Sequence, residues 1–244
     1  MLCSCQYENA QELYDTAPII EPPDTTQTDT THIDTTPVKQ LLVDLPFNGT
    51  IEDISDNEIP VVTHGGVVLT SDRFWNDNHA LFLNGENQFI ELNLEDQDSV
   101  SVAFWFNCSS GISCFSSLFD YGKNAIKTNI DGYSGPTSFY ITSFYNNLDE
   151  LHADFYFQYF MWYHIYVSAC SKPVIYVNGE NAGEIHKNII LNLTNNSLVF
   201  GKSVMNDTGD EKHFYGVIDD IKIFNYALSD QEIKDLYNKN VVKK

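Results

Sequence analysis

Two adjacent aspartates, Asp219 and Asp220, stand inside the apolar stretch from Val217 to Phe224. β-Branched and aromatic residues make this stretch a predicted strand, in which aspartate is disfavoured. A buried carboxylate is costly unless it is hydrogen-bonded, paired with a cation or bound to a metal. At least one of the two must therefore be compensated. The alternative without an ion is that Asp219 accepts backbone N–H bonds while Asp220 faces water.

Aromatic residues among polar neighbours form a second candidate site. Sugars bind to aromatic platforms that are flanked by hydrogen-bonding side chains, because their C–H faces stack on rings while their hydroxyls need polar partners. The candidates in predicted loops are Trp75, Asn76, Asp77, Tyr145 and Asn146. The alternative for Trp75 is that it closes the end of the fold as a buried plug together with Phe74.

The cysteines carry an argument about compartment. Cys108 and Cys114 bracket a short loop, and a disulfide between them is plausible in an exported protein. Cys170 follows an apolar strand and is predicted to be a buried free thiol. The predicted domain contains no Cys-x-x-Cys pair, which argues against zinc.

The elements that must position these residues are β-strands. About a dozen short apolar or alternating runs follow Lys39, and Asn-Gly turns at Asn84 and Asn178 predict hairpins. Between Ser99 and Asn107, alternate residues are expected to face the core. Ser229, with Glu232 three residues later, predicts the capped start of one short helix. The sequence thus predicts an all-β, two-sheet antiparallel sandwich with a single C-terminal helix.

Residues 1–38 differ from the domain predicted at 39–240. They are rich in Thr, Asp and Pro and poor in large apolar side chains, so we expect a disordered tether. The run from Leu2 to Cys5 resembles a bacterial lipoprotein cleavage box with Cys5 as the lipidated residue, although the basic and hydrophobic parts of a signal peptide are absent. Two incidental cysteines are the alternative.

Four threonines of this tether each follow an aspartate, which resembles the O-glycosylation acceptor of exported Bacteroidetes proteins. They are Thr16, Thr25, Thr30 and Thr35. An Asp/Thr-rich segment without glycans is the alternative. Together these features predict an exported cell-surface, outer-membrane or periplasmic lipoprotein that meets the membrane only through its lipid. The net charge of −21 argues against a nucleic-acid partner.

The ordered set of motifs resembles the laminin-G-like, concanavalin A-like lectin/glucanase family, from about Val38 to Tyr237. The motifs are Phe47-Asn48-Gly49, Asp53-Ile54-Ser55, the run from Ala80 to Gly85, Ser101 to Phe106, Trp162-Tyr163-His164, Ile175 to Gly179 and Phe214 to Leu236. The resemblance implies a jelly roll whose first and last strands lie side by side. It also implies a structural Ca²⁺, with Asp219 as the best ligand, Asp53 as the second and the carbonyl of Gly85 as a third.

Three functions follow from the resemblance. The first is a non-catalytic, monomeric glycan-binding module, and the second is a module that binds a surface protein in adhesion. The third is a glycoside hydrolase, but the Glu-x-Asp-x-x-Glu pattern of the glucanases of this fold is missing from the sequence. His164 belongs to the Trp-x-His motif and is expected to pack rather than to act as a base. The sequence therefore favours glycan binding without catalysis.

Overall fold

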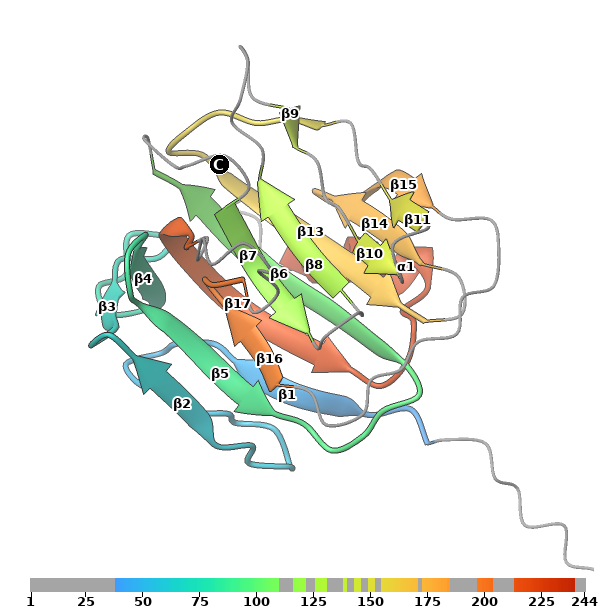
Figure 1. Cartoon of the computed structure of the whole chain (residues 1–244), viewed down its shortest axis with the longest axis horizontal. Coiled ribbons are helices and arrows are strands. Elements are labelled where there is room, and N and C mark those ends of the chain that lie inside the picture. Colours follow the sequence, from blue (N-terminus) through green and yellow to red (C-terminus); the bar gives the residue numbers. More distant parts are fainter. Residues whose placement is uncertain are drawn as a thin grey trace, which may run out of the picture. The chain divides into compact units, whose positions relative to one another are not determined.

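The computed structural model describes residues 38–109, 116–121, 126–130, 138–139, 143–145, 149–151, 155–170, 173–184, 197–203 and 213–239. Within them, two antiparallel sheets face each other, as predicted (Figure 1). The larger sheet has the order β15 (Glu180–Glu184), β14 (Val174–Val177), β13 (Trp162–Ala169), β6 (Val100–Cys108), β17 (Tyr215–Phe224), β4 (Ala80–Asn84) and β3 (Val68–Thr70), and β1 (Leu41–Leu45) also pairs with β17.

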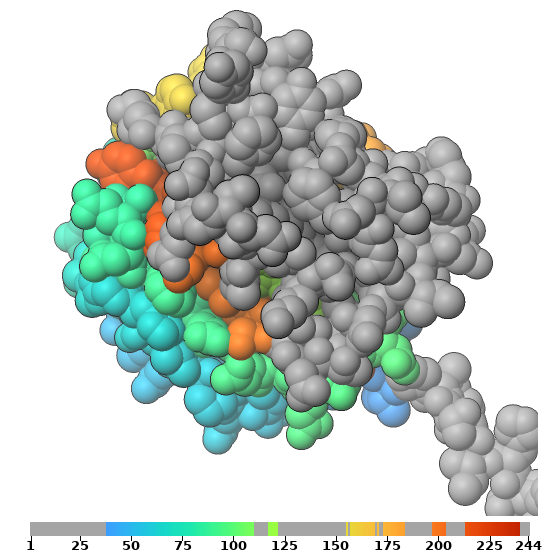
Figure 2. Space-filling view, viewed as in Figure 1, coloured from blue at the N-terminus to red at the C-terminus, as the bar shows by residue number. Residues whose placement is uncertain are grey.

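The smaller sheet lies in front of the larger one in Figure 1. Its order is β2 (Val61–His64), β5 (Phe89–Asn93), β16 (Ser197–Phe200), β7 (Ser116–Tyr121) and β8 (Ile126–Ile130). Two short pairs are β10 (Ser143–Tyr145) with β11 (Asp149–Leu151), and β9 (Ser138–Phe139) with β12 (Phe155–Tyr156). Figure 2 shows the face that carries β5 and β16.

Strand β6 shows how the sequence divides the two faces of the larger sheet. Its inward residues, including Val102, Phe104 and Phe106, are fully buried in the core between the sheets, as the alternation predicts. The intervening Ala103 and Trp105 are also buried, although they point to the opposite face. The outer face of β6 is therefore covered at these two positions, and not exposed to water.

One cover of that outer face is α1 (Asp230–Lys239), whose Ile233 is fully buried. The helix begins as the sequence predicts. The backbone N–H of Ser229 donates to the Glu232 carboxylate at 2.7 Å, and the Glu232 N–H donates to Ser229 Oγ at 3.4 Å, which is a capping box. No helix in the described part of the chain is long and apolar enough to cross a membrane.

Strand β17 is the centre of the larger sheet and changes partner along its length. Its first half pairs with β4 and its second half with β1, so the first and last strands lie side by side as expected. The register against β6 shifts between Asp219 and Lys222, which marks a β-bulge. Asp220 lies in this bulge with φ +48°, a left-handed conformation that aspartate tolerates better than most residues. The acidic pair that looked anomalous in a strand thus occupies its irregular point.

The two Asn-Gly turns have different outcomes. Asn178-Gly179 closes the β14–β15 hairpin, as predicted, with both residues at positive φ. The hairpin predicted at Asn84-Gly85 is wrong, because β4 and β5 belong to different sheets. Asn84 Oδ1 accepts hydrogen bonds from the N–H groups of Glu86, Asn87 and Gln88, which makes a longer turn that crosses between the sheets. A two-residue hairpin would leave no room for that crossing.

Candidate functional site

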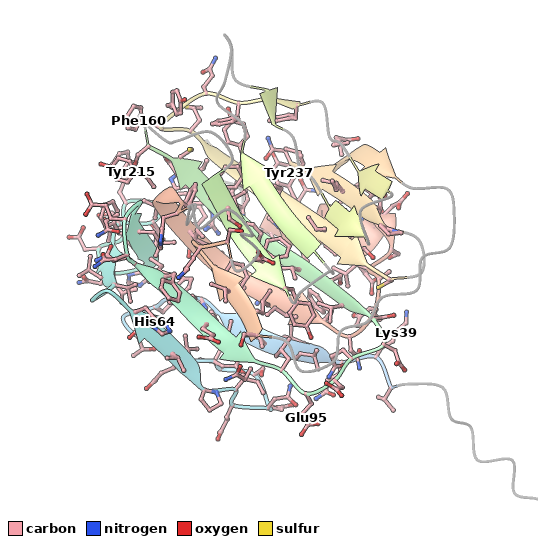
Figure 3. All side chains as sticks on the ribbon, viewed as in Figure 1. Lys39, His64, Glu95, Phe160, Tyr215 and Tyr237 are labelled. Atoms are coloured by element: carbon pink, nitrogen blue, oxygen red, sulfur yellow. The ribbon has the colours of Figure 1, made fainter. Side chains whose placement is uncertain are left out.

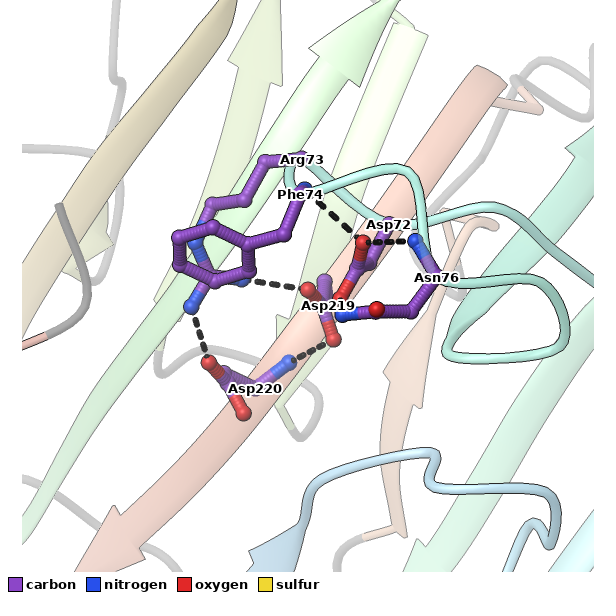
Figure 4. A network of polar contacts seen from close by, with 6 residues as sticks. All are labelled: Asp72, Arg73, Phe74, Asn76, Asp219 and Asp220. Atoms are coloured by element: carbon purple, nitrogen blue, oxygen red, sulfur yellow. Dashed lines mark hydrogen bonds and ion pairs between the residues drawn. The ribbon is translucent and has the colours of Figure 1, made fainter. Parts of the chain in front are cut away.

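The charge that compensates the acidic pair is an arginine. Arg73, the only arginine of the chain, forms ion pairs with both Asp219 and Asp220 (Figure 4). The guanidinium is a fork of N–H donors that suits carboxylates. It lies between two rings, with its Cζ 4.6 Å from the Phe74 centroid and 4.7 Å from the Trp105 centroid. The counter-charge therefore comes from the β3–β4 loop, and sequence reasoning missed it.

Asp219 is almost completely buried beneath this loop. Burial, and next the carboxylate of Asp220, raise the pKa of Asp219 to about 8, while Arg73 opposes the rise. Asp219 Oδ1 also accepts the backbone N–H of Asp220 at 2.8 Å. The alternative that Asp219 accepts backbone N–H bonds is therefore correct in part.

The predicted calcium ligands are not brought together. Asp53 accepts four hydrogen bonds, from the N–H groups of Asp44, Ser55 and Ile59 and from Ser55 Oγ, at 2.8–3.0 Å. Each of its oxygens receives two of them, so its acceptor capacity is filled by β1 and by its own loop. Calcium wants six to eight oxygens at 2.3–2.6 Å.

The positions of these residues along β17 lead to the same result. Gly85, at φ +73°, packs against Tyr215, and Asp53 bonds to Asp44, which is opposite Lys222. Asp219 lies between these points, about 13 Å along the strand from Tyr215 but only about 7 Å from Lys222, because the bulge leaves Asp219 and Lys222 two β6 residues apart. Gly85 and Asp53 are therefore about 20 Å apart along β17. No group of three or more His, Cys, Asp or Glu that could hold a metal occurs among the described residues. The proposed ligand set does not fit a shared ion, and calcium binding stays a prediction without assigned ligands.

The loop from Ser71 to His79 is organised around the carboxylate of Asp72, which is buried. Asp72 Oδ1 accepts the N–H groups of Phe74 at 2.8 Å and Asn76 at 2.9 Å, and Oδ2 accepts Asn76 Nδ2 at 3.0 Å. Two backbone bonds, from the Asp72 N–H to the Asn76 carbonyl and from the Trp75 N–H to the Asp72 carbonyl, complete the turn. The loop therefore has a defined conformation, held by Asp72 from within and by Arg73 on the sheet.

Trp75 is held at the tip of this loop with 88 % of its surface exposed. The alternative that it plugs the end of the sandwich is wrong. Its φ of +67° lies in the left-handed region, which is a strained conformation for a bulky residue and one that glycine adopts freely. Neither packing nor backbone preference explains a tryptophan here, and such outliers concentrate at functional sites.

The polar candidates beside Trp75 lie on the same loop. Asn76 and Asp77 are exposed, and Asp77 Oδ1 accepts the Ser71 hydroxyl at 2.7 Å. The structure thus brings Trp75, Asn76 and Asp77 to one surface. Tyr145 ends β10, but its side chain lies outside the described part, as does Asn146.

The cysteine predictions divide. Cys108 is a free, buried thiol at the last position of β6, and its side chain belongs to the core between the sheets. Burial raises its pKa to about 12. This does not match the predicted disulfide, whose partner Cys114 lies outside the described residues. Cys170 is a buried free thiol, as expected. Cys5 and the four tether threonines also lie outside the described residues.

His164 packs as expected and lacks the character of a base. It is buried beside Trp105, with ring centroids 5.3 Å apart, and beside Tyr237 at 6.1 Å. Burial, and next the charge of Arg73, lower its pKa to about 3, so the ring is neutral at neutral pH. A base with this pKa would be too weak to accept a proton from a substrate efficiently near pH 7.

The structure also contains a polar pocket of about 260 Å³ that the sequence did not predict. Its lining residues are Gln40, Leu42, Asn57, Ile59, Leu94, Glu95, Gln97 and Asn225. They come from both chain ends of the domain and from the segment after β5. No local motif joins them, so only the fold could assemble them. The sequence did contain a hint of the role of Arg73. It is the one arginine in a chain with 34 acidic residues, which makes it a candidate partner for a buried carboxylate.

Solved structures with the same fold include carbohydrate-bound proteins. Domain 4 of the extracellular arabinanase AbnA from Geobacillus stearothermophilus, in complex with arabinotriose, is 18 % identical with a TM-score of 0.63, and the match covers 82 % of this chain and 98 % of that one. The binding domain of botulinum neurotoxin DC, in complex with SialylT, is 20 % identical with a TM-score of 0.59, covering 82 % and 51 %.

A further similar structure is the binding domain of Paraclostridial Mosquitocidal Protein 1, which is 17 % identical with a TM-score of 0.63, covering 82 % of this chain and 52 % of that one. The chain thus spans about half the length of the two toxin binding domains. At these identities the likeness shows the fold alone. The comparison with curated proteins found no match.

A sequence model of the concanavalin A-like lectin/glucanases superfamily, Laminin_G_3, matches residues 84–234, which is more than half of the chain. The sandwich, the paired first and last strands and the single closing helix agree with that match. The chain belongs to the concanavalin A-like lectin/glucanase superfamily.

Proposed function

We propose that this domain is a non-catalytic glycan-binding module and that Trp75 is its stacking platform. The observation that carries the proposal is the 88 % exposure of Trp75 on a loop that Asp72 holds in a defined conformation, with the exposed Asn76 and Asp77 next to it in the chain. A rigid aromatic ring presented to solvent loses little conformational entropy when a sugar stacks on it. The arabinotriose complex of the similar arabinanase domain supports a carbohydrate as the ligand.

The loop supplies the polar groups that sugar binding requires. Asn76, Asp77 and Asn78 are exposed beside the ring, and they offer amide and carboxylate groups to hydroxyls. The Asp72 bonds and the Arg73 ion pairs hold this surface before any ligand arrives. Preorganisation of this kind favours affinity because less order remains to be imposed on binding.

The size of the stacking contribution can be bounded. One face of an indole ring covers roughly 80 Å² of apolar surface, which corresponds to about 2 kcal/mol at about 25 cal/mol per Å². Removing the ring should therefore weaken glycan binding about 30-fold.

The test is affinity electrophoresis and calorimetry against neutral polysaccharides, arabinan among them, with wild type, Trp75→Ala and Phe160→Ala. Phe160 is a matched control, because it is 64 % exposed at φ +63° in the turn before β13 (Figure 3). We expect an approximately 30-fold loss for Trp75→Ala and no loss for Phe160→Ala. Equal binding by Trp75→Ala and wild type would contradict the proposal.

Adhesion to a surface protein is the second function open to this fold. A protein ligand would survive enzymatic removal of its glycans, whereas a glycan ligand would not. Binding to intact cells before and after deglycosylation therefore separates the two.

We also propose that the module is displayed outside the cell through lipid on Cys5. This part rests on the sequence of the tether alone. Incorporation of labelled palmitate that disappears in Cys5→Ser would support it, and unchanged labelling would contradict it.

A further inference from the structure

The polar pocket described above opens far from Trp75. Gln40 and Leu42 belong to the start of the domain, Asn225 follows β17, and Glu95 and Gln97 follow β5. Figure 3 shows Glu95 and Lys39 at one edge of the domain, away from Phe160 and Tyr215. Asp219, beneath the Trp75 loop, and Asn225, in the pocket wall, are separated by about 16 Å along β17, once the bulge is taken into account. The pocket is therefore a separate place from the aromatic platform.

Hydrogen bonds fix the amide groups on one wall of the pocket. Asn57 Nδ2 donates to the carbonyls of Leu41 at 3.1 Å and Leu42 at 2.9 Å, which covers the edge of β1. Gln40 Nε2 donates to Asn57 Oδ1 at 2.7 Å, and the Gln40 N–H donates to Asn225 Oδ1 at 2.8 Å. These amides hold their positions without a ligand.

Several polar side-chain atoms that line the pocket can still form hydrogen bonds with a ligand. Each primary amide offers two N–H donors and an oxygen with two lone pairs. Within the described part of the chain, Gln40 Oε1, Gln97 Oε1 and the Glu95 carboxylate accept no hydrogen bond, and Gln97 Nε2 donates only to the Glu95 carbonyl, at 3.1 Å. Leu42, Ile59 and Leu94 supply an apolar floor. The carboxylate and amide groups suit the hydroxyls of a ligand, and the apolar side chains suit its C–H groups. A sugar has both.

Size and charge narrow the ligand class. The volume of about 260 Å³ lies just below the roughly 300–1,000 Å³ of pockets that hold drug-sized molecules. No Lys, Arg or His lines the pocket, and Glu95 makes its one charge negative. A phosphate, a sulfated sugar or a sialic acid would find no cation there. A single neutral sugar ring satisfies both limits.

We infer that this pocket is a second carbohydrate subsite, which takes one neutral sugar unit by hydrogen bonds to Gln97, Glu95 and Gln40 over the apolar floor. The inference rests on the proposed glycan-binding function, but it assigns a different surface from Trp75. A chain with both subsites holds a polysaccharide at two points, so each engagement raises the effective concentration for the other.

The probes are four neutral monosaccharides, arabinose, galactose, glucose and N-acetylglucosamine, titrated into the full chain and followed by ligand-observed NMR. The variants are Gln97→Ala, Gln97→Trp to fill the pocket, Trp75→Ala, and Gln231→Ala as an exposed amide on α1. Thermal unfolding verifies that each variant is folded. Asn57 is left intact because its bonds support β1.

We expect at least one monosaccharide to bind wild type, with a tenfold or greater loss in Gln97→Ala and no detectable binding in Gln97→Trp. Trp75→Ala and Gln231→Ala should keep this pocket binding. No monosaccharide binding to wild type, or equal binding by Gln97→Trp, overturns the inference.

The two proposals can fail separately. If Trp75→Ala weakens polysaccharide binding and Gln97→Trp binds polysaccharide as wild type does, the stacking role of Trp75 is supported and the pocket is rejected as a subsite. If Gln97→Trp abolishes polysaccharide binding and Trp75→Ala leaves it unchanged, the pocket is supported as a subsite and the stacking role of Trp75 is rejected.

Discussion

At the scale of single residues, the Arg73 guanidinium resolves the conflict between an apolar strand and two aspartates. It is buried between the rings of Phe74 and Trp105 and reaches both carboxylates. An arginine can do this because its fork pairs with two carboxylates while its flat faces stack on rings, which a lysine cannot match. The bulge at Asp219 and Asp220 places the two acids within reach of one cation.

A pH prediction belongs to the same residue scale. The pKa of Asp219 is raised to about 8, chiefly by burial, while an unfolded aspartate titrates near pH 4. Between these values the folded chain binds more protons than the unfolded chain, so this group lowers the free energy of unfolding as the pH rises. We expect the difference in stability between wild type and Asp219→Asn to change steadily from about pH 4 to about pH 8.

Urea denaturation across this range measures the difference. Asp77→Asn serves as the control, because Asp77 is an exposed acid on the nearby loop. A difference that stays constant with pH for Asp219→Asn would contradict the raised pKa.

At the scale of elements, the loop from Ser71 to His79 and helix α1 together cover the outer face of the larger sheet around Trp105. Trp105 lies where they meet: its ring stacks on Tyr237 of α1 at 5.6 Å and carries Arg73 of the loop on its face. The loop is thus part of the packed structure, and its tip is the part that projects. A rigid base with an exposed tip is the arrangement that a stacking platform needs.

Arg73→Ala tests how strongly the loop is attached to β17. The change leaves two carboxylates, one of them deeply buried, without their cation, and breaking a buried pair in this way costs about 3–5 kcal/mol. We expect a loss of that size at pH 9, where Asp219 is ionised, together with weaker glycan binding as the Trp75 loop loses its anchor.

The control for this prediction is Lys234→Ala, because the Lys234–Glu180 pair is exposed and 4.0 Å long. Such pairs contribute about 0–1 kcal/mol. Denaturant unfolding compares the two variants, and a loss below about 1 kcal/mol for Arg73→Ala would show that the ion pairs do not anchor the loop.

At the scale of the whole molecule, charge limits the ligands. The chain carries a net charge of −21 with a pI near 4.4, so it repels polyanions at neutral pH. Stacking and hydrogen bonds to neutral hydroxyls depend little on salt, because screening acts on charge–charge terms.

We therefore expect the affinity for a neutral polysaccharide to change less than about twofold between 50 and 500 mM salt, and no retention on heparin. Calorimetry at the two salt concentrations and heparin chromatography check this. Retention on heparin at physiological salt would reveal a basic surface that the proposals do not contain.

Much of the fold was predictable because it depends on local patterns. The alternation in β6 and the capping box of Ser229 and Glu232 are each encoded within a few residues, and both are confirmed. The hairpin at Asn84-Gly85 was predicted wrongly, because turn chemistry does not state which sheet the next strand joins. Trp75 was found from composition, but its exposure depends on where Asp72 and Arg73 are anchored.

The sequence by itself determined the class of fold and the need to compensate an acidic pair, since burial and periodicity act within single segments. The pairing of the first and last strands was implied by the family resemblance. Only the tertiary structure decided that Arg73 supplies the compensation and that Gln40, Gln97 and Asn225 share one pocket. Those outcomes join residues distant in the chain, and their partners are selected by the geometry of packed sheets, which no local pattern contains.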